Sequence, residues 1–168
     1  MTMTPAQKRT FIENDLYYEL RGLLGSATIW RATQVEQAGF NIVVAMDAAF
    51  LHARNLFNFL AAATKNDSSV TEFGVPAPYT SAVYSDWSGA LHDHVVHVRP
   101  ARLQPTNTVG GQHLNQQVEV FAREVLRLWI LFESDPAASD FEPELRVARE
   151  QAIADSAEDA AGRITALF

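Results

Sequence analysis

The sequence predicts an all-α protein, an up-and-down bundle of about five helices that forms a single domain over residues 1–168. Three observations lead to this prediction. Apolar residues recur at helical spacing in two long segments, 38–63 and 114–133. Clusters of turn-forming residues separate the helical segments, and no segment has the alternating pattern of a half-buried strand. The length is that of about one domain with a full core.

The first helix is expected over residues 5–24. Thr4 is a suitable N-cap, and Pro5 at the first helical position already has the backbone angle that a helix needs. The following segment, 26–36, either continues this helix or connects it to the next one. The inner stripe of the first helix should contain Leu16, Leu20, Leu23 and Leu24.

The second helix, 38–63, is apolar on most of its sides, which indicates either burial against several neighbours or a subunit interface. One narrow line of it is polar, with Asp47, Arg54 and Asn58 on one face and Leu51 between them. Polar groups on such a helix need partners or water. The line therefore indicates either a hydrogen-bonded packing network or the wall of a polar cleft.

Three further helices complete the bundle. The third is expected over 81–98 and ends before Pro100, and the fourth, 114–133, has the clearest helical period. The fifth runs over about 140–166, and its apolar stripe from Ile153 onward is rich in alanine and buries little area. We therefore expect this last helix to be peripheral. The connecting loops are expected at 64–78 and 99–113.

Composition and charge exclude several classes of protein. The chain has no cysteine, which excludes a disulfide framework, a cysteine nucleophile and iron–sulfur clusters. A net charge of −7 argues against nucleic-acid binding, which usually needs a basic surface. No apolar run is long enough to cross a membrane, and residues 1–10 lack the apolar stretch of a signal peptide. We expect a cytoplasmic protein without a cofactor.

Histidine and aspartate side chains gather on the third helix. Asp93 and His97 are four residues apart and share a face, and Asp86 lies two turns earlier on the same line. Two aspartates and a histidine are ligands for a divalent metal, although another helix would have to supply more. The alternative is that Asp93 and His97 form a surface pair and that His94 is a half-buried, hydrogen-bonded histidine.

A catalytic arrangement is possible if the third helix packs against the polar line of the second. Arg54 would then face His94 or His97. An arginine beside a histidine suits phosphoryl chemistry, because the guanidinium stabilises the charged transition state while the imidazole acts as a general acid or base.

Two short strings of the sequence carry a family resemblance. His52-Ala53-Arg54-Asn55-Leu56 and Leu91-His92-Asp93-His94-Val95-Val96-His97 resemble a group of bacterial helical proteins whose layout is similar to HEPN-type domains. The resemblance covers about residues 40–132. It implies a helical bundle that often dimerises. Many HEPN-type domains are metal-independent ribonucleases of toxin–antitoxin or phage-defence systems, and others are non-catalytic binding modules.

The chain departs from the catalytic members of that family at one point. They keep an arginine, usually followed by a polar residue, and a histidine about two turns later on the same helix. Arg54 and Asn55 match the start of this pattern, but residues 56–64 contain no histidine. We therefore expect a non-catalytic HEPN-like module that acts as a homodimer or with a protein partner. The alternatives are a ribonuclease using Arg54, His94 and His97, and a metal-binding bundle using Asp86, Asp93 and His97.

Overall fold

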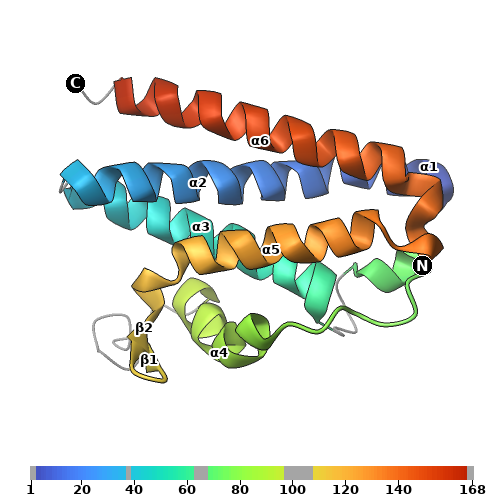
Figure 1. Ribbon diagram of the computed structural model, residues 1–168, viewed down its shortest axis with the longest axis horizontal. Coiled ribbons are helices and arrows are strands. Elements are labelled where there is room, and N and C mark those ends of the chain that lie inside the picture. Colours follow the sequence, from blue (N-terminus) through green and yellow to red (C-terminus); the bar gives the residue numbers. More distant parts are fainter. Residues whose placement is uncertain (1–2, 37–38, 63–67, 97–107, 166–168) are drawn as a thin grey trace.

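The computed structural model describes residues 3–36, 39–62, 68–96 and 108–165, and within them consecutive long helices alternate in direction (Figure 1). This confirms the prediction of an all-α bundle. The helices are α1 (Pro5–Phe11), α2 (Tyr17–Glu36), α3 (Gly39–Ala61), α4 (Ala82–Val96), α5 (Val118–Glu133) and α6 (Glu142–Thr165).

The first helix is longer than the sequence pattern predicted. A π-helical turn, η1 (Ile12–Leu16), joins α1 to α2, and the segment 26–36 continues as helix rather than as a connector. The N-terminus is capped as expected, because the Gln7 amide donates to the Thr4 hydroxyl oxygen over 3.3 Å. The extended α2 packs against both α3 and α6.

A small hairpin, β1 (Thr108–Val109) and β2 (Gln112–His113), precedes the fourth long helix. Its turn consists of Gly110 and Gly111, whose φ angles of 56° and 81° favour glycine. These two glycines are therefore explained by the turn. The remaining short elements are the 3-10 helices η2 (Val70–Phe73), η4 (Leu114–Gln116) and η5 (Pro136–Phe141).

The core lies where α3 meets α5 and α2. Phe50 and Phe57 of α3 are fully buried, and the ring centroid of each lies 5.9 Å from that of Phe121 on α5 in an edge-to-face arrangement. In Figure 1, α3 passes behind α5. The inner sides of α3 are thus covered, as its apolar pattern predicted, by residues that include Leu20, Leu23, Trp87, Val125, Leu128 and Trp129.

The C-terminal helix α6 lies along α2 (Figure 1). It is attached through Leu145, whose side chain is fully buried and whose carbonyl oxygen accepts a 3.2 Å hydrogen bond from the Trp129 indole nitrogen. Ile153 is exposed, so the prediction that it belongs to a buried stripe was wrong. The buried stripe consists instead of Leu145, Ala148, Ala152 and Ser156.

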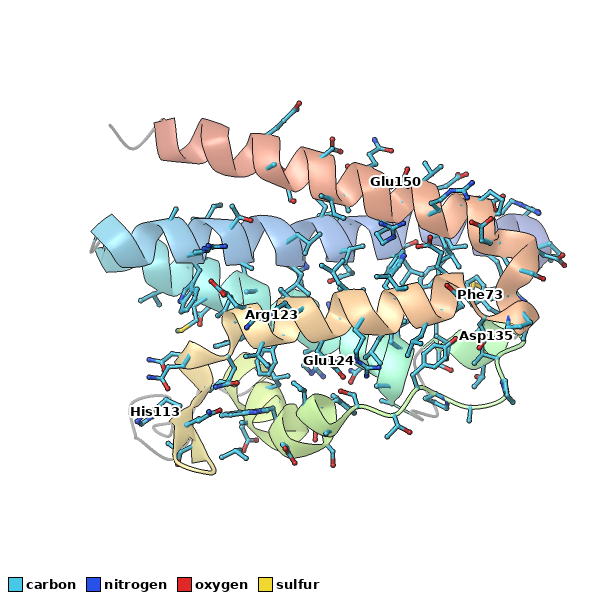
Figure 2. All side chains as sticks on the ribbon, in the orientation of Figure 1. Phe73, His113, Arg123, Glu124, Asp135 and Glu150 are labelled. Carbon is cyan, nitrogen blue, oxygen red and sulfur yellow. The ribbon has the colours of Figure 1, made fainter. Side chains whose placement is uncertain are left out.

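The start of α4 is anchored to α5. The Ser81 hydroxyl accepts a hydrogen bond from the Tyr84 amide over 3.1 Å and donates one to the Glu124 carboxylate over 2.6 Å. Glu124 projects from α5 on the side of α4 (Figure 2) and also binds Arg127 at 2.7 Å. Of the helices that the structure describes, none is both long and apolar enough to cross a membrane.

Candidate functional site

One side of α3 carries three large apolar residues that are exposed. Val43, Val44 and Leu51 are exposed by 45%, 47% and 42%. Asp47 and Arg54, on the same line as Leu51, are half-buried. We call these five residues the α3 outer face. It joins the polar line noticed in the sequence to the apolar residues beside it.

Next to this face, a small polar network connects α3 to α2. One Glu19 carboxylate oxygen lies 2.8 Å from Nδ1 of His52, and the other accepts a hydrogen bond from the Asn55 amide over 3.1 Å. The ring of Tyr18 packs edge-on against the His52 ring at 5.5 Å between centroids. His52 and Asn55, which lie beside the polar line on α3, therefore serve helix packing.

His52 is held tightly against α2. Its side chain is buried, and its Nε2 atom lies against Gly22, where an added Cβ would stand only 2.4 Å away. Its other ring nitrogen is bound to Glu19. Both ring nitrogens thus face α2, while part of His52 lines a second cavity.

A cavity of about 440 Å³ opens beside Arg54. Its walls include the carboxylates of Asp15 and Glu19 and the amides of Asn55 and Asn58. Within the part of the chain that the structure describes, the Arg54 guanidinium has no hydrogen-bond or ion-pair partner. Two residues of the polar line, Arg54 and Asn58, thus lie at this cavity, whereas Asp47 is not among the residues that line it.

The α4 side of this region is formed by Tyr84. Its hydroxyl donates a hydrogen bond to the Asn58 side-chain oxygen over 3.3 Å. Burial raises the pKa of Tyr84, and the positive charge of Arg54 acts in the opposite direction.

The π-helical turn η1 contributes Asp15 and Leu16 to the same cavity. A π-turn inserts an extra residue into a helix and is frequent at functional sites. Here it lies across from Arg54 on α3. This turn was not predictable from the sequence, because residues 12–16 fit an ordinary α-helical pattern.

A second cavity, of about 410 Å³, lies over α2 between α3 and α6. Gly22 and Gly25 are among the residues that line it, together with His52 from α3 and Asp159 from α6. On the α6 side, Arg21 pairs with Asp159 at 2.7 Å, and the Tyr17 hydroxyl is hydrogen-bonded to Asp155. These contacts tie α2 to α6 beside the cavity.

The predicted catalytic residues are placed only in part. Arg54 lies at the cavity, as described above. The backbone of His94 belongs to α4, but its side chain and the whole of His97 lie outside the described residues. A meeting of Arg54 with His94 or His97 therefore stays a prediction.

The metal-site prediction has the same status. Asp86 and Asp93 are exposed on α4, and His97 lies outside the described residues. Among the residues that the structure describes, no three histidine, aspartate or glutamate side chains lie close enough together to hold a metal ion. The two aspartates of α4 thus have no third ligand in the described part of the chain.

Comparison of the chain with protein-family models, curated proteins and solved structures finds no match. Fold and site together define an all-α helical bundle in which one central helix has a partly apolar outer face beside a polar cavity.

Proposed function

We propose that this protein is a non-catalytic, HEPN-like interaction module that forms a homodimer through the α3 outer face. The observation that carries the proposal is the exposure of Val43, Val44 and Leu51 on the central helix of the bundle. Single exposed apolar residues are common, but several beside each other on one face are typical of an interaction surface. Interface centres combine such residues with a few polar groups around them.

The polar groups of the same region support a binding rather than a catalytic role. His52 and Asn55 are used to hold Glu19, and residues 56–64 of the chain contain no histidine after Arg54. The HEPN resemblance would require such a histidine for ribonuclease activity. Without that histidine, Arg54 is better suited to bind a protein partner, because arginine is enriched at protein interfaces.

Solution mass, measured by light scattering during size exclusion, tests the proposal. We expect the wild-type protein to have twice the chain mass of 18.6 kDa. The protein concentration should be about 10–100 µM, because one helix face offers only a modest interface area. Leu51→Glu should weaken association by about tenfold or more, because a buried charge at an interface centre lacks a partner.

The matched control is Leu131→Glu. Leu131 is exposed by 42%, the same fraction as Leu51, but lies on α5. It should leave the dimer intact. A wild-type protein that stays monomeric at 100 µM would overturn the proposal, as would equal effects of the two substitutions on association.

The ribonuclease is the second candidate, favoured by the open position of Arg54 beside a cavity. RNA cleavage by wild type, Arg54→Ala and His97→Ala separates it from the first proposal. Cleavage that is lost in both variants would support the enzyme and contradict a non-catalytic module. An inactive wild type, or equal cleavage by all three proteins, would eliminate the ribonuclease.

A further inference from the structure

The polar cavity beside Arg54 is lined by a positive and a negative side chain that have no partner. Arg54 lines it from α3 and is half-buried, and Asp15 lines it from the π-helical turn η1 and is exposed. Among the residues that the structure describes, neither side chain forms a hydrogen bond or an ion pair, and the two do not pair with each other across the cavity. A half-buried charge without a partner is unfavourable, so a ligand that supplies the missing partner would be bound favourably.

Further groups around Arg54 are suited to an anion. The Asn58 side-chain oxygen accepts a hydrogen bond from the Tyr84 hydroxyl over 3.3 Å, which leaves the amide N–H groups of Asn58 for another acceptor. The Ser68 hydroxyl also lines the cavity. A carboxylate accepts two parallel hydrogen bonds from an arginine and can accept more from amide and hydroxyl donors. The Arg54 side of the cavity therefore offers the donors that a carboxylate group needs.

The acidic side of the cavity is suited to a cation. Asp15 and Glu19 are four residues apart in the chain, and both line the cavity. The oxygens of Glu19 are already used by His52 and Asn55, whereas those of Asp15 are open. An ammonium group has three donors for such oxygens. Two carboxylates also repel a ligand with several negative charges, so the cavity disfavours a nucleotide or an RNA backbone.

The remaining wall of the cavity is apolar. Leu16, Leu56 and Phe59 are buried and are among the residues that line it. The volume of about 440 Å³ is in the range of small-molecule sites, which combine apolar walls with a few polar groups that fix orientation. A small ligand with one anionic group, one cationic group and an apolar part would match all three kinds of wall.

We infer that this cavity binds a small α-amino acid with an apolar side chain. The carboxylate of the ligand pairs with Arg54 and Asn58, and its ammonium group pairs with Asp15. Its side chain lies against the apolar wall that includes Leu16. The inference goes beyond the proposed dimer, because every residue of this site comes from one chain. It also gives the π-helical turn a role, since Asp15 and Leu16 both belong to that turn.

Isothermal titration calorimetry with three related molecules tests the inference. L-leucine carries both charged groups, L-leucinamide lacks the carboxylate, and isocaproate lacks the ammonium group. Wild type should bind leucine with a Kd of about 1 mM or lower, and the other two about tenfold or more weakly, because each leaves one charge of the cavity unpaired. Equal binding of the three molecules would overturn the inference. So would a failure to bind leucine, valine, isoleucine, methionine and phenylalanine.

Two variants assign the charges. Arg54→Gln should weaken leucine binding about tenfold or more and should no longer distinguish leucine from leucinamide. Asp15→Asn should weaken it similarly and should no longer distinguish leucine from isocaproate. The site is overturned if both variants fold by circular dichroism and bind leucine as wild type does. The preference of wild type among the three molecules decides the question even if a variant fails to fold.

The chain offers a matched control for each variant. Glu13→Gln changes an acidic residue of the same π-helical turn, but Glu13 lines a different cavity. Arg123→Gln removes an arginine of α5 whose side chain is 72% exposed. Both controls should bind leucine with wild-type affinity. A loss of binding in the controls as large as in Arg54→Gln and Asp15→Asn would contradict a site at this cavity.

The cavity and the dimer can fail separately. Calorimetry gives the stoichiometry, which should be one leucine per chain, and light scattering gives the mass. A dimeric wild type that binds none of these amino acids would overturn the cavity site and leave the dimer standing. A monomeric wild type that binds leucine selectively would overturn the dimer and support the cavity site.

Discussion

Replacement of Gly22 by alanine tests how tightly α2 and α3 are joined beside the candidate site. A Cβ at this position would lie 2.4–2.6 Å from three atoms of the His52 ring, which is far inside van der Waals contact. The ring has little freedom to retreat, because it is buried, bound to Glu19 at 2.8 Å and packed against Tyr18. The added methyl group must therefore displace His52 or separate the two helices.

The magnitude follows from three contributions. Overpacking a well-filled contact costs about 1–3 kcal/mol. Loss of the hydrogen bond between His52 and Glu19 costs about 0.5–1.5 kcal/mol more. Alanine offsets about 1 kcal/mol of this through its higher helix propensity. Gly22→Ala should thus lower the free energy of unfolding by about 2 kcal/mol, which lowers the Tm by about 4–8 °C for a chain of this size.

Two other glycines in helices are matched controls, measured by thermal and urea unfolding followed by circular dichroism. At Gly25, also in α2, the nearest atom to an added Cβ is the Ser156 Cβ at 3.8 Å, an ordinary contact. At Gly89 in α4 no atom lies within 4 Å of it. Gly25→Ala should be neutral or stabilising, and Gly89→Ala should stabilise by about 0.5–1 kcal/mol, because only helix propensity changes.

A double-mutant cycle with His52→Ala isolates the contact. Once the ring is removed, Gly22→Ala should no longer destabilise the protein, and the coupling energy between the two positions should be about 1–3 kcal/mol. The reasoning fails if Gly22→Ala is as stable as wild type, or if its penalty is unchanged in the His52→Ala background.

Two further predictions concern hydrogen bonds at the ends of helices. Ser81→Ala should lower stability by about 1–2 kcal/mol at pH 7, since α4 loses its cap and Glu124 loses a donor. Arg127 and Ser81 lower the pKa of Glu124, so this carboxylate stabilises the fold above its unfolded-state pKa and ceases to do so as the pH falls through its folded-state value. The difference in free energy of unfolding between wild type and Ser81→Ala, measured with urea, should therefore become smaller below about pH 4. A difference that does not change with pH would contradict a stabilising contact between Ser81 and the ionised Glu124. Burial and the hydrogen bond to Asp135 raise the pKa of Tyr79, so the hydroxyl stabilises the fold below about pH 10, and this contribution is lost as the pH rises through its folded-state value. Tyr79→Phe should lower the free energy of unfolding by about 1 kcal/mol at pH 7. Above pH 10 its free energy of unfolding should fall less steeply with pH than that of wild type. If the two proteins lose stability equally at alkaline pH, this role of Tyr79 is excluded.

Much of the fold was predictable because it depends on local patterns. The helical period over 114–133 and the turn residues between segments indicated the all-α bundle, and α5 was observed over Val118–Glu133. The capped start at Thr4 was also correct. Errors arose where tertiary packing outweighed local preference. Gly22 and Gly25 weaken a helix in isolation, yet α2 continues to Glu36 because it packs along α3 and α6.

The sequence by itself determined that α3 would be apolar on several sides and polar along one line through Asp47 and Arg54. That statement depends only on spacing along one helix. The tertiary structure decided the use of each group. It bound His52 and Asn55 to Glu19, placed Arg54 at a cavity opposite the π-helical turn, and left Leu51 exposed. These contacts join residues more than thirty positions apart, and such distances are set by how helices pack rather than by periodicity within any one of them.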